Sequence, residues 1–163
     1  MAGGRTYKRR VPYERLRERL VESRLPWDDD AERWSIGAVL LAPNAWARKF
    51  SGKLYAGHFY DRGHGWLWEE LGTALVRTKV LHDDPDSIGD WLSKGQIQRR
   101  FREQFVGSAG KEIACCTSDC FWWHGLWYVD RVLVAAKLRE AVIREAKLLG
   151  EALDRADQWE SRR

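Results

Sequence analysis

The stretch FYDRGHGWLWEEL, residues 59–71, holds the residue types that acid–base catalysis needs. His64 titrates near neutral pH, and Glu69 and Glu70 follow it closely. A catalytic histidine also needs a nucleophile and a group that orients it, and the sequence contains no GxSxG-type signature. The aromatic residues of this stretch instead favour packing, with His64 capping or hydrogen-bonding near the start of the following helix.

A second candidate site is the run CCTSDCFWWH, which spaces Cys116, Cys120 and His124 four residues apart. On a helix these side chains would lie near one face, and thiolate and imidazole are ligands that Zn²⁺ prefers. Structural zinc sites more often use C-x2-C pairs split over two elements, and Ser118 and Asp119 indicate a break in the helix. We therefore favour cysteines whose thiols are buried or bind no metal, and we expect no cofactor.

The aromatic run FWWHGLWY, residues 121–128, offers rings on which the bases of a single-stranded nucleic acid can stack. Such platforms usually interleave the rings with Lys and Arg. Here the nearest cations are Lys111 and Arg131, so packing in a core or an interface is favoured.

A phosphate-binding loop is a further kind of site to consider. Gly110 and Lys111 resemble the end of a P-loop, but Phe105 stands where its first glycine belongs and Glu112 replaces the magnesium-binding Ser or Thr. We find no nucleotide-hydrolysing site and expect a protein that is not an enzyme.

Positive charge is concentrated at the N-terminus. The chain carries a net charge of +4, of which residues 1–25 contribute +5 and all later residues −1. Lys8, Arg9 and Arg10 in this segment are the candidates for contact with nucleic-acid phosphates. The alternative is a solvated N-terminal segment whose positive charges bind no partner.

Composition and periodicity predict an all-α protein in the cytoplasm. The 163 residues suit one domain, no run of about 18 apolar residues predicts a membrane span, and three cysteines do not form a disulfide framework. We expect a basic, partly flexible arm (1–26), a compact multi-helix head (27–125) and one long amphipathic C-terminal helix (126–163). The apolar stripe of that helix, a candidate partner or self-association surface, comprises Leu138, Val142, Leu149 and Leu153.

Three stretches, in this order, resemble the N-terminal domain of replicative DNA helicases of the DnaB type. They are AERWSIGAVLLAPNAW, HFYDRGHGWLWEEL and WYVDRVLVAAKLREAVIREAKLLGEALD, and the likeness covers about residues 30–156. In the second stretch the family's aromatic and histidine positions correspond to Phe59, Tyr60, His64 and Trp68.

The resemblance implies a helical head followed by part of a helical hairpin, in a stand-alone module without the ATPase domain. It implies a non-catalytic role in DNA replication, as a primosome component that contacts a replicative helicase, a primase or a loader, and that self-associates. The alternative is a small DNA-binding protein that uses its basic arm.

Overall fold

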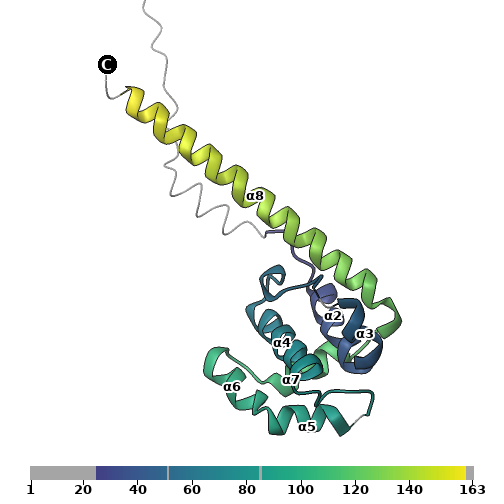
Figure 1. Cartoon of the computed structure of the whole chain (residues 1–163). Helices are drawn as coiled ribbons and strands as arrows, with labels where there is room; N and C mark the ends of the chain where they lie inside the picture. Colours follow the sequence, from purple (N-terminus) through teal and green to yellow (C-terminus); the bar gives the residue numbers. More distant parts are fainter. Residues whose placement is uncertain (1–24, 51, 85, 161–163) are drawn as a thin grey trace, which may run out of the picture. The chain divides into compact units, whose positions relative to one another are not determined.

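The computed structural model describes residues 25–160 except residues 51 and 85, so the basic arm, apart from residues 25 and 26, lies outside the described residues (Figure 1). The described part contains seven α-helices and no strand, which confirms the all-α prediction. The elements are α2 (Asp29–Leu41), α3 (Pro43–Phe50), η1 (Ala56–His58), α4 (Arg62–Gly72), η2 (Thr73–Arg77), α5 (Asp86–Lys94), α6 (Ile97–Gln104), α7 (Ala109–Thr117), η3 (Trp122–His124) and α8 (Gly125–Glu160).

The chain divides into two compact units. The first unit is Trp27–Lys137, and the described part of the second comprises residues 25, 26 and 138–160. The long helix α8 begins at Gly125, within one residue of the predicted start. The first unit nevertheless continues to Lys137, because Tyr128, Val129 and Val132 are buried. The compact head therefore extends beyond the boundary that we predicted at residue 125.

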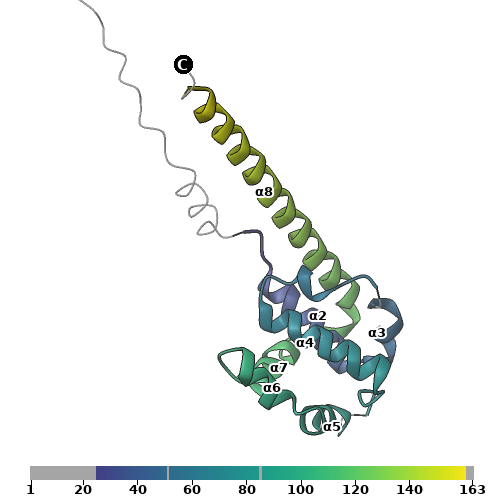
Figure 2. The same ribbon diagram turned by 60° about the vertical axis from the view of Figure 1, so that its left-hand side comes forward.

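Helix α2 is the centre of the first unit and is buried along most of its length. Its start follows from the sequence: the Asp28 carboxylate accepts a hydrogen bond from the Ala31 N–H at 3.0 Å, and the acidic first turn suits the positive end of the helix dipole. In both views α2 lies beside α4 and α7 (Figures 1 and 2). The hydrophobic core lies among these helices.

Helix α4 begins at Arg62 and places His64 in its first turn. The Asp61 carboxylate accepts hydrogen bonds from the N–H groups of Gly63 and His64, at 2.7 and 3.1 Å, and so caps the helix. The α-helical hydrogen bonding ends at Gly72 and continues as the π-helical turn η2.

Tryptophan occurs both in the core and on the surface. Trp46 and Trp91 are buried, Trp66 and Trp68 are partly buried against the core, and Trp122, Trp123 and Trp127 are exposed. No described helix combines the length and the apolar character that crossing a bilayer requires.

Gly37 allows α2 and α7 to approach closely. A Cβ atom on Gly37 would lie 1.9 Å from the backbone oxygen of Cys116, too close for any real contact. Both helices would have to move apart to admit a side chain, and the core between them would lose packing.

Gly37→Ala is therefore expected to lower the free energy of unfolding by about 3 kcal/mol, the upper range for an overpacked core. Gly89→Ala is the matched control, because a Cβ atom at this α5 position meets nothing within 4 Å. The control should gain about 0.5 to 1 kcal/mol from the helix propensity of alanine. Urea unfolding followed by circular dichroism measures both, and equal stability of the two variants would contradict the proposed close contact.

Candidate functional site

His64 is a buried histidine held between two carboxylates. Its side chain is 3% exposed, its Nδ1 lies 3.1 Å from Glu32 Oε2, and its Nε2 lies 2.9 Å from Glu112 Oε1. The three residues come from α4, α2 and α7 respectively. This group joins three helices of the first unit through one ring.

Glu32 is fully buried, and its carboxylate has several hydrogen-bond donors. Besides His64, the backbone N–H groups of Tyr60 and Asp61 donate to its two oxygens, at 2.6 and 3.2 Å. Glu32 thereby fixes the segment that leads into α4. A buried carboxylate with such donors is held in one orientation, and its hydrogen bond to Nδ1 orients the imidazole.

The two carboxylates control the protonation of His64. Burial alone would lower the pKa of this imidazole, but hydrogen bonds to Glu32 and Glu112 outweigh burial and raise the pKa above its usual value. Asp61 and the charge of Glu112 act in the same direction. The geometry accommodates a proton on each ring nitrogen, so that both carboxylates accept a hydrogen bond.

His64 contacts neither Glu69 nor Glu70, the two carboxylates that follow it in the sequence. Glu70 binds Arg100 through two hydrogen bonds of 2.6 and 2.7 Å, and the Glu69 side chain is exposed. The actual partners, Glu32 and Glu112, lie 32 and 48 residues from His64 in the sequence. Sequence reasoning missed both.

One signal for Glu32 was available. Glu32, Ile36 and Val39 follow a helical spacing, and Ile36 and Val39 are apolar residues of the buried face of α2. A carboxylate on such a face requires a hydrogen-bond partner in the core. Nothing in the sequence indicates Glu112 in the same way.

The other residues of the FYDRGHGW stretch pack around this site. Phe59 is buried, and its ring centroid lies 5.6 Å from that of Trp68. Tyr60 is partly exposed and stacks at 5.2 Å on Trp27. These contacts are what a scaffold role predicts.

The zinc candidates of the sequence do not assemble as one ligand set. Cys120 Sγ contacts the Trp34 carbonyl oxygen at 3.4 Å, and His124 is exposed among aromatic rings. Burial raises the pKa of Cys120 to about 11. Cys116 instead lies near His64 and Glu112, and the potential ligand atoms of these three residues are all within 4.8 Å of one another.

Cys116 is also not suited to be a nucleophile. It is fully buried, and burial, followed by the charge of Glu112, raises the pKa of its thiol far above the usual value. Reactive cysteines are exposed and have lowered pKa values.

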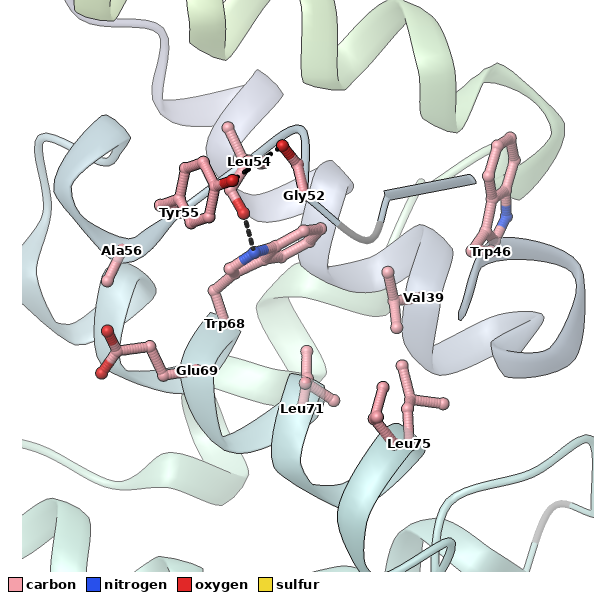
Figure 3. Close-up of a pocket in the computed structure, with 12 residues that line it drawn as sticks. Val39, Trp46, Gly52, Leu54, Tyr55, Ala56, Trp68, Glu69, Leu71 and Leu75 are labelled. Atoms are coloured by element: carbon pink, nitrogen blue, oxygen red, sulfur yellow. Dashed lines mark hydrogen bonds between the residues drawn. The ribbon is translucent and has the colours of Figure 1, made fainter. Parts of the chain in front are cut away.

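An apolar pocket opens beside α4, with a volume of about 260 Å³ (Figure 3). Trp68 forms part of its wall, and the indole N–H of this residue donates to the Leu54 carbonyl oxygen at 2.9 Å. The remaining lining is mostly aliphatic and includes Val39, Leu71 and Leu75. Such a pocket suits an apolar side chain or a small apolar ligand.

Four large aromatic side chains and one leucine are exposed just before and at the start of α8. We call this set the aromatic surface segment: Phe121, Trp122, Trp123, Leu126 and Trp127, which are between 40% and 57% exposed. Rings of neighbouring residues contact one another, as between Phe121 and Trp123 at 5.3 Å. The guanidinium group of Arg131 lies 4.7 Å from the centroid of the Trp127 ring.

The predicted stripe of α8 is partly accessible to solvent. Leu138 and Leu149 are both 51% exposed, whereas Val142 and Leu153 have intermediate exposure. Lys8, Arg9 and Arg10 lie outside the described residues.

Comparison with known proteins identifies a similar fold. No protein-family model matches the sequence, and no curated protein matches it either. The N-terminal domain of DnaB helicase from Mycobacterium tuberculosis is a similar solved structure, with a TM-score of 0.63 and 21% sequence identity. The match covers 82% of this chain and 90% of that one, so the fold expected from the three stretches is confirmed.

His64→Ala tests the importance of the buried group. The substitution leaves Glu32 and Glu112 without their shared partner, and we expect a loss of about 3 kcal/mol in the free energy of unfolding. The control His82→Ala removes an exposed histidine side chain and should change stability by less than about 0.5 kcal/mol. Chemical unfolding monitored by circular dichroism measures both, and a loss of less than about 1 kcal/mol for His64→Ala would contradict this role.

Proposed function

We propose that this chain is a non-catalytic protein-interaction module of DNA replication that binds a replicative helicase, a primase or a helicase loader. The observation that carries the proposal is the fold, which matches the N-terminal domain of DnaB helicase over 82% of the chain. Fold alone does not specify a partner, so the surface features must support the proposal independently.

The aromatic surface segment supports binding to another protein. Soluble monomers rarely expose large groups of neighbouring apolar side chains, because each ring remains in unfavourable contact with water. Tryptophan is also enriched among the residues that contribute most to binding energy in interfaces. Arg131 lies beside Trp127 and forms an ion pair with Asp28, so charged groups flank the rings. An apolar centre with charged neighbours is typical of a protein–protein interface.

The backbone N–H groups of the loop that resembles a P-loop make hydrogen bonds within the protein, which supports a non-catalytic role. Ser108 caps α7 by accepting a hydrogen bond from the Lys111 N–H, and the Gly110 N–H donates to the Gln98 side chain at 3.0 Å. A phosphate would need these same N–H groups.

Self-association through α8 is the second part of the proposal. Leu138 and Leu149 expose apolar surface on the predicted stripe of α8. A helix with such side chains gains stability when a second apolar face covers them.

Binding to the purified replicative helicase, primase and loader of the same cell provides the first test. We expect a dissociation constant that is about 30-fold higher for the double variant Trp123→Ala/Trp127→Ala, the loss typical of an interface hot spot. Tyr55→Ala is the control, because Tyr55 is exposed to a similar extent but lines the apolar pocket. Calorimetry gives the constants. Failure of all three partners to bind the wild-type chain would exclude the proposal.

Binding to DNA is the alternative function, and the affinity of the chain for a DNA duplex tests it. If Lys8, Arg9 and Arg10 of the arm contact phosphates, the affinity for a DNA duplex will fall steeply as the salt concentration rises. It will disappear when residues 1–25 are deleted. Binding to a protein through aromatic side chains depends less on salt.

Leu149→Glu tests self-association. We expect the wild-type chain to associate as its concentration rises and the variant to remain a monomer, because a carboxylate cannot be buried in an apolar interface without a partner. Leu148→Glu introduces the same charge one residue away, about 100° around the helix, and should retain most of the association. Light scattering after size exclusion gives the mass. Identical monomers for all three proteins would rule out an α8 interface.

A further inference from the structure

We propose that His64, Glu112 and Cys116 bind one Zn²⁺ ion between α4 and α7. The potential ligand atoms of the three residues all lie within 4.8 Å of one another. Imidazole nitrogen, carboxylate oxygen and thiolate sulfur are the three ligand types of protein zinc sites. This inference concerns a different part of the molecule from the aromatic surface segment and does not rest on the proposed function.

The orientation of His64 suits a metal ligand. Glu32 Oε2 lies 3.1 Å from Nδ1, so Nδ1–H donates to this carboxylate and Nε2 faces Glu112 and Cys116. A carboxylate behind the histidine is the usual second partner of a zinc-bound imidazole, because it fixes the tautomer and makes Nε2 a stronger ligand. Glu32 is itself held by two backbone N–H groups.

The atoms that face each other require a cation between them. With Nδ1–H directed at Glu32, the neutral imidazole presents a lone pair at Nε2, and Glu112 Oε1 presents another at 2.9 Å. Two lone pairs at this distance repel. A proton on Nε2 removes the repulsion between Nε2 and Oε1, whereas Zn²⁺ also engages the nearby sulfur of Cys116.

The three ligands come from two elements, as in many metal sites. Glu112 and Cys116 are four residues apart on α7, so their side chains lie on one face of that helix, and His64 comes from α4. Cys116 is fully buried and is a free thiol.

The net charge of the site does not change when the ion binds. Zn²⁺ displaces two protons, one from His64 Nε2 and one from the Cys116 thiol, and it therefore adds no net charge to a buried site. Arg33, whose Nε lies 3.7 Å from Glu112 Oε1, is the nearby cation, and its other partner is the partly exposed Asp29.

A surface hollow of about 420 Å³ gives the ion a path to the site. Glu112 lines this hollow, together with Tyr60, Asp61 and Phe105 among others, and its side chain is 30% exposed. Water in the hollow can supply a fourth ligand and complete a tetrahedron around the ion.

Metal binding to the untagged full-length chain tests the proposal. Titration with Co²⁺, a spectroscopic substitute for Zn²⁺, should give one ion per chain and a thiolate-to-cobalt charge-transfer absorption band. Cys116→Ser should abolish the band, and Glu112→Gln should weaken binding at least about tenfold. The matched controls Cys115→Ser and Cys120→Ser should keep both the band and the stoichiometry.

Thermal unfolding gives an independent readout. Zn²⁺ should raise the midpoint temperature of the wild-type chain and of Cys120→Ser, and a chelator should reverse the rise, because an ion that binds only the folded state stabilises it. Neither Zn²⁺ nor the chelator should change the midpoint temperature of Cys116→Ser.

Three results would overturn the proposal. They are the absence of stoichiometric Co²⁺ or Zn²⁺ binding by the folded wild-type chain, a cobalt band that survives Cys116→Ser, and a band lost only in Cys120→Ser. If Cys116→Ser fails to fold, as circular dichroism would show, the wild-type titration and Glu112→Gln still decide the question.

Discussion

Glu32 is a carboxylate with almost no access to water, and the first unit is built around its hydrogen bonds. An ionised carboxylate in this position would cost several kcal/mol if it lacked donors. The donors come from the backbone of Tyr60 and Asp61 and from the ring of His64. One buried carboxyl group therefore determines how the chain enters α4 and which way the histidine faces.

Close packing between helices adds a second constraint. At the crossing of α2 and α7, only glycine fits at position 37, because the Cys116 carbonyl oxygen occupies the place of a side chain. This contact lies near the histidine group, since Cys116 and Glu112 belong to the same helix. The packing at Gly37 and the hydrogen bonds of His64 thus stabilise the same pair of helices, and each limits the movement of the other.

The elements with strong local signals could be predicted from the sequence. The long apolar periodicity of the C-terminal segment predicted α8, and the acidic residues from Asp28 onward explain where α2 begins. The start of α4 could not be predicted in the same way, because the two glycines after Asp61 lower helix propensity. Tertiary contacts override that propensity, since Gly63 packs against the Phe101 ring and Gly65 against the Ala56 carbonyl group.

The composition of the site could not be predicted, because it depends on contacts between distant residues. The sequence analysis named Cys116 as a potential ligand, but spacing suggested partners from its own segment. The residues nearest to it in space include His64 from α4, and only the fold brings the two helices together. Periodicity reports which face of a helix is buried, and it contains no information about what lies opposite that face.

A histidine between two carboxylates can hold a fold together and still bind an ion, and the two roles use the same geometry. The proton on Nε2 and a zinc ion would occupy the same gap between His64 and Glu112, so each excludes the other. Which one is present depends on pH and on the free metal concentration, because zinc must displace two protons. The hydrogen bond to Glu32 serves both states, since it orients Nδ1 in either case. The proton alone joins α4 to α7 through one hydrogen bond, whereas the metal would add a bond to Cys116 and tie the helices at two residues of α7.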